Sequence, residues 1–162
     1  MSESYSKSIA NAVKDVLAAE ELNFSFDEDN GLFGLNFTIE GPIHSLDFFI
    51  EISDSNYVVY AVPPIVADAK NSSVMAAIAE FICRANYGLV YGNFDIDFSD
   101  GEIRYRFFVD CDGITPSKDM IKSSILVILS VFERYAPGIA AVLFGSANPE
   151  EQINKIEAAE EE

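Results

Sequence analysis

Four acidic side chains within eight residues have a spacing that could hold a metal ion. They are Asp95, Asp97, Asp100 and Glu102, and carboxylate oxygens are the ligands that Ca²⁺ and Mg²⁺ prefer. A calcium-binding loop would need its glycine at position 100, where this chain has aspartate. The pair Asp100-Gly101 is instead typical of a tight hairpin turn. The sequence therefore favours a structural role for these acids, and we expect no metal site.

The histidine and the cysteines give no pattern for nucleophilic catalysis. His44 is the single histidine and lies in a predicted loop, while Cys83 and Cys111 are far apart. A Ser-His-Asp or Cys-His arrangement needs a histidine in the site, and the sequence has no G-x-S-x-G motif. It also has no glycine-rich phosphate loop. Two carboxylates could still converge in space, but no pair stands out, so we predict no enzyme, no catalytic residue and no cofactor.

The charge of the chain limits its partners. At 162 residues it fits a single domain, and its formal net charge of −17 disfavours phosphate backbones and anionic lipid headgroups. We therefore expect no nucleic acid and no membrane among its partners, and a protein partner could be basic.

The N-terminus lacks the pattern of a signal peptide. The longest apolar stretch, 125–132, is too short to span a bilayer. Two unpaired cysteines suit a reducing compartment, so we predict a cytoplasmic protein.

The first half of the chain predicts one helix followed by four strands. Residues 6–20 carry apolar side chains at helical spacing, with serines ahead of them as caps. Residues 24–62 then alternate between apolar and polar, as half-buried strands do. Turns are expected at Asn30-Gly31, Gly41–His44 and Asp54-Ser55, and Pro63-Pro64 ends the last strand. The cross-strand pairs predicted from these turns are Phe26–Leu35, Phe24–Phe37, Phe37–Phe48, Leu35–Ile50 and Phe33–Ile52.

The second half predicts a helix, a hairpin and a long helix. Residues 71–87 form the first helix, and a two-residue turn at Asp100-Gly101 joins the two strands. The pairs predicted from this turn are Phe98–Ile103, Ile96–Tyr105 and Phe94–Phe107 on the inner face, and Asp97–Arg104 and Asp95–Arg106 on the outer face. Thr115 is the expected N-cap of a long helix, with Pro116 at the first helical position and residues 117–136 as the body of the helix. Pro137-Gly138 is expected to break this helix, and a short amphipathic segment follows.

These elements predict an α+β fold, with helices packed on an antiparallel sheet of hairpins in the order α-β-β-β-β-α-β-β-α. Residues 1–145 are expected to form a single domain. Residues 146–162 are rich in glutamate and are expected to form an acidic C-terminal helix or a disordered tail.

One surface of the predicted sheet carries apolar side chains that the helices do not need. If Phe48 and Phe107 face the helices, then Phe49 and Phe108 point the other way, and strand 57–62 is apolar on both faces. We therefore predict a partner-binding patch that consists of Phe49, Val58, Tyr60 and Phe108, since contiguous exposed apolar patches usually mark interfaces. The alternative is that the segment 139–144 folds over this face.

Several short motifs resemble the YbjN family of bacterial sensory transduction regulators. The matching residues are Arg84-Ala85-Asn86-Tyr87, Gly92–Asp97, Asp100-Gly101-Glu102-Ile103 and Arg134-Tyr135-Ala136-Pro137. The resemblance implies a fold like that of type III secretion chaperones, which are small, acidic and often dimeric α+β proteins that hold extended segments of client proteins. It also implies a regulatory or chaperone-like role without catalytic residues.

The acidity, the two-sided strands and the resemblance together favour a non-enzymatic protein-binding regulator or chaperone-like module, expected to be a homodimer. An alternative is a small-molecule-binding regulatory domain, with an aromatic-lined pocket between the sheet and helix 117–136. A third is an enzyme that uses unpaired carboxylates in a cleft.

Overall fold

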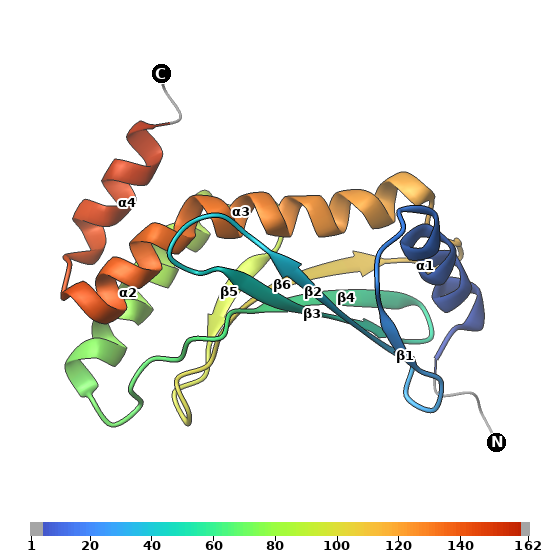
Figure 1. Cartoon of the computed structure of the whole chain (residues 1–162), viewed down its shortest axis with the longest axis horizontal. Coiled ribbons are helices and arrows are strands. Elements are labelled where there is room, and N and C mark those ends of the chain that lie inside the picture. Colours follow the sequence, from blue (N-terminus) through green and yellow to red (C-terminus); the bar gives the residue numbers. More distant parts are fainter. Residues whose placement is uncertain (1–4, 160–162) are drawn as a thin grey trace.

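The computed structural model describes residues 5–159 and has an antiparallel sheet covered by helices on one face (Figure 1). The elements in chain order are α1 (Lys7–Ala19), β1 (Ser25–Asp27), β2 (Leu32–Thr38), β3 (Ser45–Ile52), β4 (Asn56–Val62), α2 (Ser72–Gly88), β5 (Asn93–Ile96), β6 (Ile103–Asp110), α3 (Lys118–Gly145) and α4 (Pro149–Ala158). The six strands lie in the order β1-β2-β3-β4-β6-β5. The predicted α+β fold and order of elements are confirmed, with α4 as an additional helix.

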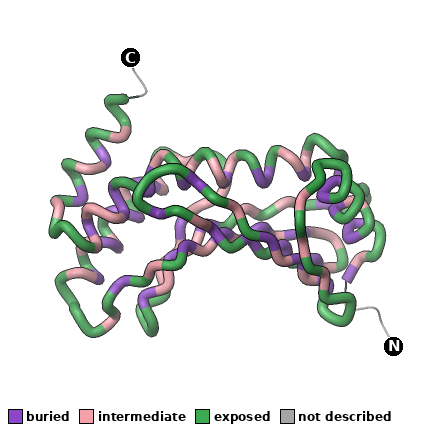
Figure 2. Tube along the Cα trace, viewed as in Figure 1, coloured by how far each residue is buried: buried purple, intermediate pink, exposed green. Residues whose placement is uncertain are grey.

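The core lies between the sheet and α3, and we call the face of the sheet that packs against α3 the inner face. Helix α3 contacts β4 and β6, α1 packs against α3, and α2 packs against β5. Tyr57, Val59 and Tyr105 on the inner face are fully buried. Figure 2 shows that buried positions follow the strands and the side of α3 that faces them. The other face of the sheet, the outer face, carries no helix (Figure 1).

The two hairpins with Asn-Gly or Asp-Gly are longer than predicted. Asp27 pairs with Leu32, and beyond the pair Ile96–Ile103 the Asp97 N–H donates to the Glu102 carbonyl, so each loop has four residues (28–31 and 98–101) instead of two. In both loops the glycine N–H donates to an aspartate carbonyl four residues earlier, Gly31 to Asp27 at 2.9 Å and Gly101 to Asp97 at 2.8 Å. The predicted registers of these hairpins were therefore wrong by two residues. A shift of two keeps each side chain on its face, so the inner and outer assignments along the paired strands survive.

The same two-residue shift occurs between β2 and β3. Leu35 pairs with Phe48 instead of Ile50, because the loop begins one residue earlier than expected and Ile39 N donates to the His44 carbonyl at 3.0 Å. Ile39 and Ile43 are both buried, which holds the ends of the loop against the core. The predicted turn at Asp54-Ser55 is confirmed by the pairing of Ile52 with Tyr57.

Helix α3 differs from the prediction at both ends. Its N-cap is Ser117, whose hydroxyl accepts a hydrogen bond from Met120 N at 3.2 Å, so the predicted cap at Thr115 was wrong. The predicted break at Pro137 was also wrong, since the helix continues to Gly145. Pro137 is exposed, while Gly138 and Ile139 are buried in the core. Packing of the residues after the proline thus outweighs the hydrogen bond that proline removes.

The length of α3 bears on the expectation about membranes. Lys118–Gly145 is long and apolar enough to cross a membrane by length and composition alone, whereas the apolar stretch 125–132 on which the expectation was based is much shorter. A buried core helix of a soluble protein has the same properties. One side of α3 packs in the core of the protein, since Ile128, Phe132 and Tyr135 are at most 1 % exposed.

The described part of the predicted acidic tail contains a helix. Asn148 caps α4 by accepting a hydrogen bond from Glu151 N at 3.1 Å, and the helix packs against α2 and α3. Pro149 and Ile153 are buried in that contact. The division of the chain at residue 145 stays a prediction.

Two buried tyrosines should make the protein sensitive to alkaline pH. Burial raises the pKa of Tyr57 and of Tyr105 from 10.0 to about 12. The folded-state pKa lies above the unfolded one, so the stability that depends on the neutral phenols is complete below pH 10 and is lost as pH rises toward 12. We expect a loss of about 2–3 kcal/mol for each tyrosine over this interval.

Urea unfolding measured at intervals from neutral pH to pH 11.5 tests this expectation. The Tyr57→Phe variant should lose less stability over the alkaline range than the natural chain does, since one of the two titrating phenols is absent. An equally steep loss in the variant would contradict the assignment.

Candidate protein-binding face

The register of the sheet brings the four predicted patch residues together on the outer face. Phe49 on β3 lies opposite Tyr60 on β4, and Val58 on β4 lies opposite Phe108 on β6. Phe49 is 39 % exposed and Phe108 is 58 % exposed, while Val58 and Tyr60 are half-buried. The segment 139–144 belongs to α3 on the inner side, so it does not cover them. We call these four residues the outer patch.

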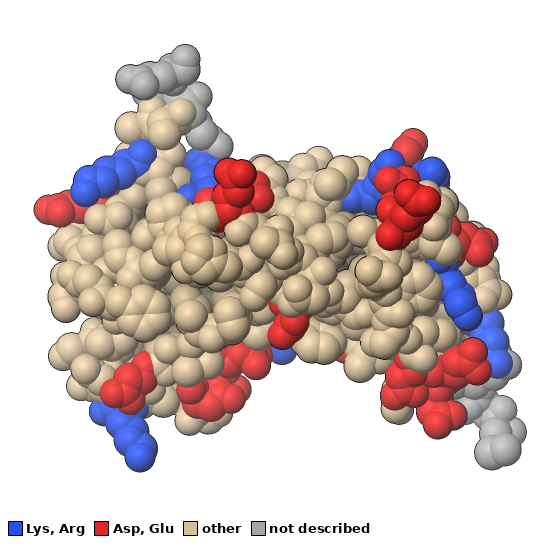
Figure 3. All heavy atoms as spheres, in the orientation of Figure 1, with Lys and Arg blue, Asp and Glu red and all other residues tan. Residues whose placement is uncertain are grey.

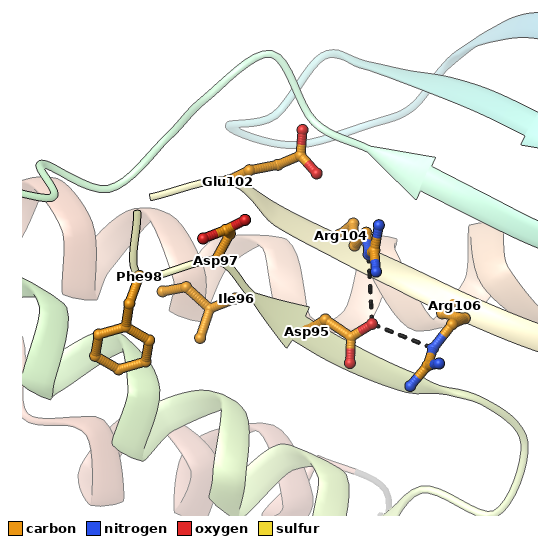
Figure 4. A pocket seen from close by; sticks show the side chains of 7 residues that line it. All are labelled: Asp95, Ile96, Asp97, Phe98, Glu102, Arg104 and Arg106. Carbon is orange, nitrogen blue, oxygen red and sulfur yellow. Dashed lines mark hydrogen bonds and ion pairs between the residues drawn. The ribbon is translucent and has the colours of Figure 1, made fainter. Parts of the chain in front are cut away.

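Arg104 and Arg106 of β6 lie beside the outer patch and share one carboxylate. Asp95 Oδ2 is 3.4 Å from Arg104 Nε and 3.2 Å from Arg106 Nε (Figure 4). The predicted pairing of Asp97 with Arg104 was wrong, because Asp97 lies beside Glu102 and accepts a hydrogen bond from Ser99 N at 2.7 Å. Hydrogen bonds from Ser99, with a smaller contribution from Arg104, hold the pKa of Asp97 below its usual value.

The arginines also link this charged group to the outer patch. The guanidinium of Arg104 lies over the ring of Tyr60, 4.8 Å from its centre. Arg106 lies opposite Tyr60 in the strand register. A hollow of about 440 Å³ adjoins both arginines and extends to the side chain of Phe98 in the hairpin loop (Figure 4). Phe98 was predicted to be an inward-facing strand residue, but it is 62 % exposed because the loop is longer than expected.

A second hollow lies on the other side of the patch, above Gly34. Gly34 pairs with Phe49, and the Ser25 hydroxyl lies 2.8 Å from where a Cβ on Gly34 would be. The hollow has a volume of about 600 Å³, and its lining includes Phe24, Asp47 and Phe49. The exposed ring of Phe49 in the lining of this hollow is a surface on which an apolar side chain of another molecule can pack.

Acidic side chains surround the outer patch. Asp47 and Glu51 on β3 and Asp110 on β6 are exposed, and Glu51 lies opposite Val58. Figure 3 shows, on the side in view, that Asp and Glu gather in separate clusters with wide uncharged areas between them. The outer face therefore combines an apolar centre with a rim that is negative at Asp47, Glu51 and Asp110 and carries Arg104 and Arg106, which share Asp95, on the β6 side.

The histidine and the two cysteines lie in different parts of the fold. Among residues 5–159, no group of three His, Cys, Asp or Glu side chains could hold a metal ion. His44 is exposed in the loop between β2 and β3, and Cys83 is exposed on α2. Cys111 is buried, and burial raises the pKa of its thiol, which disfavours the reactive thiolate.

The space between the sheet and α3 is filled by core side chains. Tyr57, Tyr105 and Phe132 are fully buried there, and Phe94 packs on Tyr105 and Phe132 with ring centres 4.9 and 5.3 Å away. A hollow near α3 measures about 160 Å³ and lies between α1 and α3 at the end of β2. Its lining is mainly aliphatic, with Phe37 as its one aromatic residue. This is smaller than the roughly 300–1,000 Å³ typical of ligand pockets.

Sequence reasoning missed the two hollows that flank the patch. Gly34 in the middle of an alternating strand was a usable signal, because a strand glycine often marks a place where another molecule approaches. The exposed position of Phe98 depended on the loop length, which the sequence pattern did not reveal.

Comparison with protein-family models identifies the family to which the chain belongs. A family model matches residues 10–141, which is most of the 162-residue chain, and its description is "Putative bacterial sensory transduction regulator". A search among curated proteins finds no match to the chain. The matched region includes the whole of the sheet, α1 from residue 10 onward and most of α3. The chain therefore belongs to the YbjN family of bacterial regulators.

Proposed function

We propose that this protein is a non-enzymatic, cytoplasmic regulator that acts by binding another protein on its outer sheet face. The observation that carries the proposal is the outer patch, in which Phe49 and Phe108 are 39 % and 58 % exposed side by side with Val58 and Tyr60. Aromatic side chains with hollows beside them are frequent anchors of protein interfaces. Membership of a regulator family supports a role without catalysis.

The charge of the chain favours a partner of complementary chemistry. The rim acids Asp47, Glu51 and Asp110 are exposed, and the whole chain carries −17. A partner surface with an apolar centre and lysine or arginine at its margin would satisfy both features. A second copy of this chain would bring like charge to the same rim, so we place the expected homodimer contact elsewhere on the surface.

Site-specific photo-cross-linking in bacterial cells tests this proposal. A benzoylphenylalanine at position 49 or 108 should give the same discrete adduct with another protein. The same probe at Leu126 or Phe144, which are 58 % and 69 % exposed on α3, serves as the matched control. Adducts from the α3 positions alone would contradict the proposal, and an adduct between two copies of the chain would assign the outer face to dimerisation.

The alternative of a small-molecule regulator has a separate test. A ligand bound between α1 and α3 should shift the NMR signals of Phe37 and Leu129, which line the hollow there, and leave those of Phe49 and Phe108 unchanged. A ligand screen in which no compound shifts these signals would count against this alternative.

A further inference from the structure

Strand β6 is longer than β5, its neighbour at the edge of the sheet. Part of β6 therefore has no partner strand on that side. β5 pairs only with Ile103–Arg106, whereas β6 continues to Asp110 (Figure 1). β4 pairs with the other side of β6 up to Asp110. Residues 107–110 therefore have a strand on one side only, and we call this stretch the open edge.

The open edge exists because the chain turns out of the sheet at Gly92. Gly92 has a φ of +74°, and a Cβ at this position would lie 2.5 Å from the Arg106 carbonyl oxygen. Beyond it, the ring of Tyr91 stacks on Phe107 with centres 6.1 Å apart, and the Tyr91 carbonyl accepts a hydrogen bond from the Tyr105 hydroxyl. Both partners of Tyr91 belong to the inner face, so the chain before β5 leaves the plane of the sheet.

The hydrogen-bond pattern shows which backbone groups face the open edge. Cys111 N donates to the Ser55 carbonyl on the β4 side at 2.8 Å. On the β5 side, Asp97 N donates to the Glu102 carbonyl at 2.9 Å. Because these directions alternate along an antiparallel strand, odd-numbered residues of β6 bond to β4 and even-numbered ones face β5. The N–H and C=O of Phe108 and the N–H of Asp110 thus point away from β4, toward the open edge.

The edge of β5, unlike the open edge of β6, has its backbone groups hydrogen-bonded by a side chain. The Asn86 amide donates to the Phe94 carbonyl at 2.9 Å and accepts from Phe94 N at 2.8 Å, as a paired strand would. Among residues 5–159 we find no side-chain hydrogen bond of this kind to the backbone of Phe108. The open edge also lacks the lysine or proline with which natural proteins protect exposed strand edges.

The surroundings of the open edge fit the side chains of an added strand. On the inner side, a hollow of about 350 Å³ is lined by Phe107, Val109 and Met120, with Asp119 also in its lining. On the outer side, the exposed ring of Phe108 continues the outer patch. Asp110 and Asp112 are exposed nearby, and no ion pair occupies these acids or Asp119 within the described part of the chain.

We infer that the open edge accepts an extended segment of a partner protein as an added β-strand, with alternating apolar and basic side chains. An apolar side chain would fill the inner hollow, the backbone would pair with Phe108 and Asp110, and a lysine or arginine would lie near the acids. This inference rests on the proposed function, in that the partner is a protein, and adds how the partner is held. A second copy would bring its own acids and its charge of −17 to the same edge.

Amide hydrogen exchange with a model peptide tests the inference on the full chain. The probe is a capped six-residue peptide of alternating valine and lysine. Without it, the amides of Phe108 and Asp110 should exchange much faster than those of Phe107 and Val109, which bond to β4. With saturating probe, the exchange of Phe108 and Asp110 should slow by about tenfold or more. A valine–glutamate peptide of the same length should bind at least about tenfold more weakly.

A pair of variants at one position isolates the backbone contact. Asp110→Pro removes the N–H that faces the open edge, while Asp110→Ala removes the same carboxylate and keeps the N–H. The proline variant should bind the probe about tenfold more weakly than the alanine variant. Slow exchange at Phe107 and Val109 in both variants would show that the strand is intact.

The outcomes separate this inference from the proposed function. If Phe49→Ser weakens probe binding while the two Asp110 variants bind equally, the outer face binds proteins but strand addition is wrong. If the probe leaves the exchange of Phe108 and Asp110 unchanged, strand addition is likewise overturned. The proposed function then still depends on the cross-linking result.

Discussion

Replacing Gly101 with alanine should destabilise the fold by about 3 kcal/mol or more. Gly101 has a φ of +82°, and a Cβ at this position would lie 2.0 Å from the Ala67 carbonyl oxygen. Ala67 N in turn donates to the Gly101 carbonyl at 2.9 Å, so the two chain segments cannot separate without breaking this bond. The chain has no tryptophan, so urea unfolding followed by far-ultraviolet circular dichroism measures the loss of stability.

Gly113→Ala is the matched control for Gly101→Ala. Gly113 has a similar φ of +72°, but a Cβ there would meet nothing within 4 Å. Its replacement should cost only about 1 kcal/mol, from backbone conformation alone. Equal losses in the two variants would show that the contact with Ala67 does not matter.

Replacing Asn86 with alanine should destabilise the fold by about 2–4 kcal/mol. The Asn86 side chain makes the two hydrogen bonds to Phe94 that close the edge of β5, and Phe94 is only 2 % exposed. Without the amide, the Phe94 N–H beside the core would lose its partner, and the Phe94 carbonyl would keep the longer hydrogen bond from the Asn93 amide, at 3.3 Å. Urea unfolding gives the free energy, and amide exchange at Phe94 should become faster in the variant.

Asn36→Ala provides the control for Asn86→Ala. Asn36 is an exposed residue of β2 whose side chain donates one hydrogen bond, to Asp47 at 2.8 Å. We expect its replacement to cost less than about 1 kcal/mol. A loss as large as that of Asn86→Ala would contradict the special role of the edge contact.

The hairpins show which part of a sheet can be predicted from sequence. Alternation assigned Phe48 and Tyr105 to the inner face and Phe49 and Phe108 to the outer face, because side-chain direction has a period of two. The registers were wrong because Asn-Gly and Asp-Gly were interpreted as complete two-residue turns. A usable signal was present, since both loops have aspartate four residues before the glycine.

That aspartate explains the longer loops in physical terms. The carboxylates of Asp27 and Asp97 accept hydrogen bonds from the backbone N–H two residues later, at 3.0 and 2.7 Å. These side-chain bonds provide acceptors for backbone N–H groups of the loop. In a shorter turn, backbone groups at these positions would pair between the strands instead. An aspartate at the first position and a glycine at the fifth therefore predict this loop better than the final dipeptide does.

Helix α3 shows the limit of local signals. Pro137-Gly138 is a strong helix-breaking pair, yet a Cβ on Gly138 would lie 2.7 Å from the ring of Phe81 on α2. This close approach of α2 and α3 uses the glycine as a packing position. Which of the two roles the pair has depends on contacts between segments far apart in the chain, and local sequence patterns do not contain them.

The candidate site was only partly predictable for the same reason. The residues of the outer patch followed from alternation, but whether α3 or its C-terminal part covers them depends on the tertiary arrangement. The open edge of β6 also escaped prediction, because it depends on where β5 ends and therefore on the correct register.

Recovery of the cross-linked partner by a double variant tests the central claim most directly. Phe49→Ser combined with Phe108→Ser removes the two most exposed side chains of the outer patch and should leave the fold intact, since neither belongs to the buried core. We predict that the natural chain and the Leu126→Ser variant retain the partner equally. The double variant should retain at least about tenfold less. Equal retention by the double variant, or a loss confined to Leu126→Ser, would contradict the assignment of the outer face.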